Sequence, residues 1–184
     1  MAKTDKYAVG EQSFSSLIEG GFLYVDKTRY LEKIVKGSKY YFLGRPRRFG
    51  KSLFLSTLKC FFEGRRDLFK GLYADSMDWN WEAHPVLHIA LNMWDYTKPG
   101  MLEVAFDEHL RKWEVEYQVD YVSNDISSRF QNVIKQAHDK SGKQVVVLVD
   151  EYDNPLVDTL NNPELFESYR NQLSAIYSNL SFAS

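Results

Sequence analysis

The chain has 184 residues, 44% of them hydrophobic and 26% charged, so it is long enough for a full domain with its own core. The formal net charge of −2 excludes a strong overall attraction to nucleic acid or to an anionic membrane. A single cysteine excludes an internal disulfide and fits a reducing compartment. The N-terminus lacks a signal-like stretch, and no apolar run approaches the roughly 20 residues that span a bilayer. We therefore expect a cytoplasmic protein.

For the first part of the chain, the sequence predicts an arm followed by two helices. Residues 1–12 are polar and predict a flexible arm, and 13–19 predicts a short helix with its apolar residues on one side. A short apolar run follows at 22–25. Asp26 is the expected N-cap of a helix that continues to about Lys36.

Strands and helices alternate along the rest of the chain. Buried strands are predicted at 40–43, 86–91 and 145–149, the last of which is continuously apolar, as in a parallel sheet covered on both faces. Helical spacing of apolar residues extends over 51–63, 101–117 and 124–140. Two further helix starts are predicted where a capping Asn precedes Pro, at Asn154-Pro155 and Asn162-Pro163. This alternation predicts an α/β domain with a parallel sheet flanked by helices.

A glycine- and arginine-rich loop connects the first predicted strand to the helix at 51–63. Backbone N–H groups in such a loop suit a phosphate chain, Lys51 would reach the terminal phosphates, and the Ser52 hydroxyl would bind Mg²⁺. The candidate nucleotide-binding residues of the loop are Arg45, Pro46, Arg47, Arg48, Phe49, Gly50, Lys51, Ser52 and Leu53. The motif predicts a P-loop (Walker A) site, and the alternative is a basic surface turn before an ordinary helix.

Two features of this loop leave alternatives open. The usual pattern is G-x-x-x-x-G-K-S/T, but Arg45 stands where its first glycine belongs, and Gly44 lies one residue too early. Either the loop is one residue longer or Arg45 replaces the glycine. The arginines at 45, 47 and 48 would neutralise phosphate charge, contact a protein or nucleic-acid partner, or simply be solvated.

An acidic pair follows the apolar strand at 145–149. Asp150 at the end of this strand would hold Mg²⁺, and Glu151 would orient the attacking water as the catalytic residue. This is the Walker B pattern, and both motifs fall at the carboxyl ends of strands, where parallel sheets bind ligands. Asp153 would join the metal shell or brace the loop. The alternative is a strand that ends in solvated acids. The adjacent Glu151 also disfavours a small-molecule kinase.

Three segments together resemble a family of predicted bacterial and archaeal AAA-like ATPases. They are 22–28 (Phe-Leu-Tyr-Val-Asp-Lys-Thr), 44–52 (Gly-Arg-Pro-Arg-Arg-Phe-Gly-Lys-Ser) and 149–155 (Val-Asp-Glu-Tyr-Asp-Asn-Pro). The resemblance extends from about residue 10 to 175, and it implies that the displaced glycine is a family trait. It also implies that Tyr24, Val25 and Asp26-Lys27 lie near the nucleotide, at the base or ribose. In many family members a nuclease-like domain follows.

The resemblance implies a P-loop NTPase fold of the additional-strand type, with sheet order 5-1-4-3-2. Strand 4 would lie between strands 1 (39–43) and 3 (145–149), and it would follow a helix that ends near Tyr177. Because few residues remain there, we expect 13–184 to be the N-terminal portion of an ATPase domain that is truncated before strand 4. An altered sheet or pairing with a partner chain would fill the empty position.

The expected function is binding of ATP and Mg²⁺ and, in the intact protein, ATP hydrolysis coupled to a conformational change. Ser52 and Asp150 are the expected metal ligands. The alternative is a nucleotide-gated module that contacts nucleic acid or a protein through the loop at 45–48.

Overall fold

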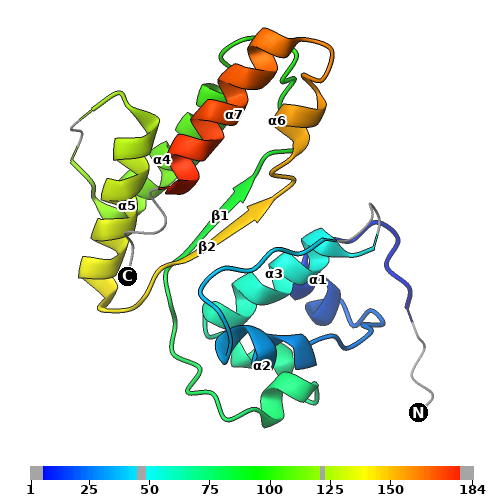
Figure 1. Ribbon diagram of the computed structural model, residues 1–184. Helices are drawn as coiled ribbons and strands as arrows, with labels where there is room; N and C mark the ends of the chain where they lie inside the picture. Colours follow the sequence, from blue (N-terminus) through cyan, green and yellow to red (C-terminus); the bar gives the residue numbers. More distant parts are fainter. Residues whose placement is uncertain (1–5, 45–48, 121–122, 179–184) are drawn as a thin grey trace. The chain divides into compact units, whose positions relative to one another are not determined.

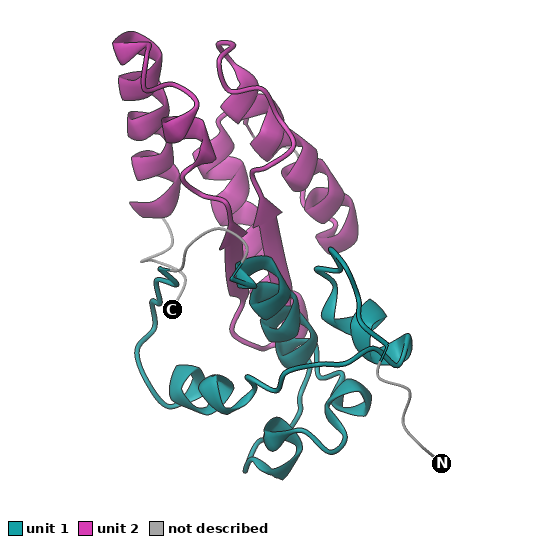
Figure 2. Cartoon of the chain, turned by 90° about the vertical axis from the view of Figure 1, so that its right-hand side faces the viewer, with its two compact units in different colours: residues 1–83 teal, residues 84–184 magenta. Residues whose placement is uncertain are grey.

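The structure is a computed structural model that describes residues 6–44, 49–120 and 123–178. The chain divides into two compact units, unit 1 (residues 1–83) and unit 2 (residues 84–184), and each is described by itself (Figure 2). No helix among the described residues is long and apolar enough to cross a membrane.

Unit 1 is a small helical unit around an aromatic core. Its elements are α1 (Phe14–Glu19), α2 (Arg29–Val35), α3 (Lys51–Phe62) and the short 3₁₀ helices η1 (Arg66–Phe69) and η2 (Tyr73–Ser76). Phe14, Phe61 and Phe69 are completely buried. The Phe14 and Phe69 ring centroids lie 4.8 Å apart, and Phe61 stacks on Trp79 at 5.2 Å. The helices predicted at 13–19 and 51–63 are confirmed within one residue at each end.

The second helix starts later than predicted. The N-cap of α2 is Thr28, so Asp26 was the wrong N-cap. The reason is that the Asp26 carboxylate accepts hydrogen bonds from the Thr28 amide and hydroxyl, both at 2.7 Å, and from the Tyr73 amide at 2.8 Å. These bonds hold residues 26–28 in a turn before the helix, as short acidic side chains often do.

The buried strand predicted at 40–43 is not present. These residues are irregular, and Tyr40, Tyr41 and Phe42 are 58%, 51% and 73% exposed. Tyr41 is tied to the end of α2, because its hydroxyl accepts the Ser38 amide at 2.7 Å and donates to the Lys33 carbonyl at 2.9 Å. A strand needs ladder hydrogen bonds to a neighbour, and no segment among the described residues pairs with 40–43.

Unit 2 contains a parallel two-stranded sheet with helices packed beside it (Figure 1). Strands β1 (Val86–Ala90) and β2 (Val146–Asp150) pair in the register Val86↔Val146 to Ala90↔Asp150. Both strands were predicted, and the order implied by the resemblance also places them side by side. The helices are α4 (Met101–Tyr117), α5 (Ile126–Ser141), α6 (Asn154–Val157) and α7 (Pro163–Ser178).

The core of unit 2 combines the buried face of this sheet with its helices. Leu87, Ile89, Phe106 and Phe130 are completely buried in it. The parallel pair and its helices confirm the α/β class.

The two predicted Asn-Pro helix starts differ in outcome. At α7, Asn162 caps the helix as predicted, because its side-chain oxygen accepts the Leu165 amide at 3.2 Å. At α6 the cap residue is Asp153, so the predicted capping role of Asn154 was wrong. The Asn154 side chain instead donates to the Leu91 carbonyl at 3.4 Å.

Candidate functional site

The predicted phosphate loop leads directly into α3 through a glycine that only a few residue types could replace. Gly50 has a left-handed backbone with φ of 73°, and the helix begins at the next residue, Lys51. The Gly50 carbonyl accepts the first helical hydrogen bond, from the Phe54 amide at 3.0 Å. Because the amides of a first turn have no earlier helical carbonyl to bind, they remain available to a ligand.

The other predicted residues of this loop fall into two groups. Lys51, Ser52 and Leu53 form the first turn of α3 and are half-buried, whereas Phe49 is 62% exposed. The remaining four lie outside the described residues; they are Arg45, Pro46, Arg47 and Arg48.

The electrostatics at the start of α3 favour an anion. The first turn contains no acidic residue, and its N-cap is a glycine, which has no side chain that could cap the helix. The positive end of the helix dipole and the Lys51 side chain therefore occur together in this turn. A phosphate at a helix N-terminus is stabilised by this kind of arrangement.

A cavity of about 230 Å³ lies beside this helix start, within unit 1. Gly50 and Leu53 line it, together with Tyr24, Val25 and Lys27 from the segment before α2. The structure thus brings Tyr24 and Val25 to the same cavity as part of the phosphate loop. The cavity is smaller than the roughly 300–1,000 Å³ of a typical ligand pocket.

Several residues of this cavity were not predicted as site residues. Leu17, Leu23 and Phe54 contribute apolar surface, and Ala8 and Glu11 come from the predicted arm. The sequence predicted helices for Leu17 and Phe54, an apolar run for Leu23 and an arm for Ala8 and Glu11. No pattern in the sequence links the arm to the phosphate loop.

Tyr24 is held in place by the core of unit 1. Its ring meets Phe14 edge to face, with centroids 5.1 Å apart. Burial raises the pKa of the Tyr24 hydroxyl, and a hydrogen bond with Thr57 opposes this rise only in part. Tyr24 therefore remains a neutral side chain that combines an apolar ring with a polar tip.

Lys27 lies at the phosphate loop. A Cβ atom added at Gly50 would lie 3.9 Å from the Lys27 Nζ. The neighbouring Thr28 is completely buried, and its hydroxyl accepts the Ala74 amide at 3.0 Å. Together with the Asp26 hydrogen bonds, this contact fixes the backbone on both sides of Lys27. Burial would raise the pKa of Asp26, but hydrogen bonds from Tyr73 and Thr28 outweigh burial and lower it.

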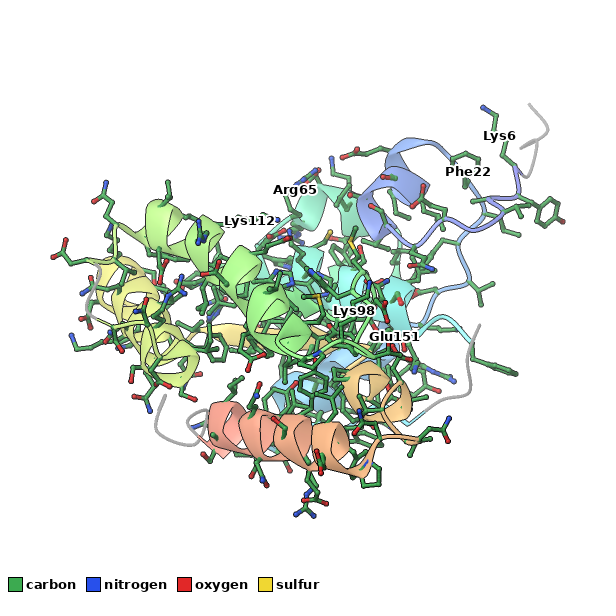
Figure 3. All side chains as sticks on the ribbon, turned by 90° about the horizontal axis from the view of Figure 1, so that it is seen from above. Lys6, Phe22, Arg65, Lys98, Lys112 and Glu151 are labelled. Atoms are coloured by element: carbon green, nitrogen blue, oxygen red, sulfur yellow. The ribbon has the colours of Figure 1, made fainter. Side chains whose placement is uncertain are left out.

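In unit 2 the predicted acidic pair lies at the carboxyl end of β2, and Figure 3 labels its second member, Glu151. Asp150 is the last residue of the strand and is only 7% exposed. Glu151 is half-buried and has a positive φ of 51°. Its amide donates to the Asp150 Oδ1 at 3.1 Å. A left-handed backbone at a glutamate is a strained conformation of a kind that clusters at functional sites.

The turn after β2 is tied to the end of β1. The Leu91 amide donates to the Asp150 carbonyl at 3.1 Å, and the Asn154 amide donates to the Glu151 carbonyl at 3.0 Å. The Asp153 Oδ1 is buried and accepts no hydrogen bond within the described residues. The turn that carries the two acids is thus hydrogen-bonded to the carboxyl end of β1.

The donor chemistry suits Mg²⁺ only with help from a ligand. The Ser52 hydroxyl and the Asp150 carboxylate are hard oxygen donors, which Mg²⁺ prefers. Ser52 belongs to unit 1 and Asp150 to unit 2. No group of three or more His, Cys, Asp or Glu side chains that could hold a metal occurs in the described parts of the chain. An Mg²⁺ ion at either side chain would take further oxygens from phosphates and waters, as Mg²⁺ sites commonly do.

Comparison with known proteins identifies the family. The family model described as Predicted AAA-ATPase matches residues 8–182. A protein of Azotobacter chroococcum mcd 1, named as an uncharacterized protein in the vnfD 5' region, is 41% identical over 175 residues. That match covers 94% of this chain but 34% of the relative, so the chain spans about a third of its length. No solved structure matches the chain. The chain belongs to the predicted AAA-ATPase family.

Proposed function

We propose that this chain binds the phosphates of ATP at the start of α3 through residues 45–53. The observation that carries the proposal is the left-handed Gly50 leading straight into a helix whose first turn holds Lys51 and Ser52 and no acid. Lys51 would bind the terminal phosphates, and the turn's amides would bind oxygens along the phosphate chain. Tyr24 and Val25, which line the adjacent cavity, would contact the base or ribose.

Mg²⁺ would be held by Ser52 and Asp150 together with the phosphates, and Glu151 would act on water. The metal supplies neutralisation of charge on the transferred phosphoryl group. The low exposure of Asp150 favours a partner cation, because a buried carboxylate needs one. Glu151 stands next to it on a strained backbone and would orient the attacking water.

Hydrolysis coupled to a conformational change is proposed for a longer protein, of which 13–184 forms the N-terminal part of the ATPase domain. A further strand would pair with β2 and with 40–43, in the order that the P-loop fold of the additional-strand type requires. Two observations support this. Tyr40 to Phe42 expose large apolar side chains, and the chain matches 34% of its relative from Azotobacter.

The test is a calorimetric titration of the wild-type chain and of Lys51→Ala with ATP–Mg²⁺ and, separately, with short DNA. We expect ATP to bind the wild type and to lose measurable binding to Lys51→Ala. In the longer protein, Glu151→Gln should keep ATP binding and lose hydrolysis. Unchanged ATP affinity in Lys51→Ala would refute the proposed site. Binding of DNA without ATP would favour the interaction module that contacts nucleic acid through 45–48.

A further inference from the structure

Lys27 is a cation that the phosphate-loop motif does not contain, yet it lies at that loop. It comes from the turn before α2, 24 positions before Lys51 in the sequence. Its Nζ would be 3.9 Å from a Cβ atom placed on Gly50, and both residues line the same cavity. The proximity is therefore a product of folding within unit 1, and no sequence spacing predicts it.

The surroundings of the Lys27 ammonium leave it available. Within the described residues, no hydrogen bond or ion pair involves this ammonium. The neighbouring acid is engaged elsewhere, because both Asp26 oxygens accept hydrogen bonds from Thr28 and Tyr73. Glu11, which also lines the cavity, accepts the Ser13 amide at 2.7 Å. The nearby carboxylates thus accept hydrogen bonds from Thr28, Tyr73 and Ser13, and none of them forms an ion pair with Lys27 within the described residues.

An anion would complement the position of Lys27. Cations near a helix N-terminus are destabilising, and the Lys27 ammonium lies near the start of a helix that also carries Lys51. The backbone on both sides of Lys27 is held by the buried Thr28 and by the hydrogen bonds of Asp26. A bound anion would offset the positive charge that gathers at this helix start.

We propose that Lys27 is a second phosphate-binding cation of the nucleotide site, beside Gly50 at the start of α3. This inference rests on the proposed nucleotide binding and deepens it. The resemblance implied that Lys27 lies near the base or ribose. The geometry assigns Lys27 to the phosphates. Tyr24 and Val25 would still contact the base or ribose.

The test compares Lys27→Met with the wild type for binding of ATP and of inorganic tripolyphosphate, which has no base. A charge-assisted hydrogen bond of about 1.5–3 kcal/mol corresponds to a loss of roughly 10- to 100-fold in affinity. We expect this loss for both ligands. Lys27→Arg should retain most of the affinity. Lys33→Met, which removes the same charge from α2 away from the cavity lining, should bind like the wild type.

The outcomes separate this inference from the proposed function. If Lys27→Met binds both ligands normally while Lys51→Ala has lost them, the Lys27 assignment is wrong and the nucleotide site stands. If Lys27→Met weakens ATP but not tripolyphosphate, Lys27 contacts the nucleoside and the assignment is also wrong. If the wild type binds neither ligand, the proposed function and the Lys27 assignment fail together.

Discussion

The segment at 40–43 and the strand β2 are similarly apolar, but only β2 forms part of a sheet. β2 pairs with β1 over five residues, from Val146 to Asp150. The 40–43 segment has no neighbouring strand among the described residues, and the Tyr41 hydroxyl is bonded to the end of α2. The difference teaches that an apolar run specifies a strand only when the fold supplies a partner for its backbone. The predicted phosphate loop therefore follows an irregular segment, whereas the acidic pair follows a paired strand.

The largest effect on stability is expected at an ion network between α4 and α5, in the unit that contains β2. Arg129 is 8% exposed and donates to Glu114 Oε1 at 2.7 Å and to Asp107 Oδ1 at 2.7 Å. Arg129→Ala would leave two carboxylates without this partner, so we expect a loss of about 3–5 kcal/mol in the free energy of unfolding. Urea denaturation measures it. The exposed Arg170, paired with Glu167, provides the control, with a loss below about 1 kcal/mol.

The same network makes a prediction about pH. Burial would raise the pKa of Asp107, but Arg129 and Arg111 outweigh burial and lower it. Since its folded pKa lies below the unfolded value, its contribution to stability is present above about pH 4 and is lost as the pH falls through the folded pKa. Arg129→Ala should show a weaker loss of stability below about pH 4. If the loss of stability below about pH 4 is the same in Arg129→Ala as in the wild type, this loss comes from other carboxylates and the prediction is wrong.

At the phosphate loop, a smaller effect is expected from Gly50→Ala. A left-handed backbone costs an L-residue about 1–2 kcal/mol, and the added Cβ would approach the Lys27 Nζ. We expect this loss of stability together with weaker ATP binding in calorimetry. Gly71 has a similar φ of 79° with nothing within 4 Å, so Gly71→Ala should lose stability but keep ATP affinity. Equal ATP affinities for Gly50→Ala and Gly71→Ala would contradict a role of Gly50 in ATP binding.

The smallest effect is expected at 40–43, which has no strand partner among the described residues. Phe42 is 73% exposed, so Phe42→Ser should change the unfolding free energy of this chain by less than about 0.5 kcal/mol. Ile89→Ala, in the completely buried part of β1, should cost about 2–5 kcal/mol. In a longer protein whose additional strand covers 40–43, Phe42→Ser should become clearly destabilising. A large loss in the present chain would show that the segment already packs in a core.

Sequence reasoning succeeded where local signals agree with local structure. The helical spacing at 101–117 matches α4 at both ends, and the apolar run before Asp150 forms β2. It failed where a tertiary contact decides the outcome. Tyr73 contributes to the turn at Asp26 that delays α2, and a missing neighbour leaves 40–43 irregular. The resemblance placed Lys27 near the nucleotide, but no residue spacing predicted its position beside Gly50, where contacts between the turn at 26–28 and η2 hold the neighbouring backbone.

The central proposal is that Gly50-Lys51-Ser52 and Asp150-Glu151 act on the same nucleotide. The most direct test is the ATP affinity of the wild type and of Asp150→Asn, each measured with and without Mg²⁺. We expect Mg²⁺ to strengthen ATP binding to the wild type by about tenfold, or 1.4 kcal/mol, and to have little effect on Asp150→Asn. The Mg²⁺-free affinities should be similar. If Mg²⁺ strengthens ATP binding to Asp150→Asn as much as to the wild type, the acidic turn of unit 2 is not part of the site.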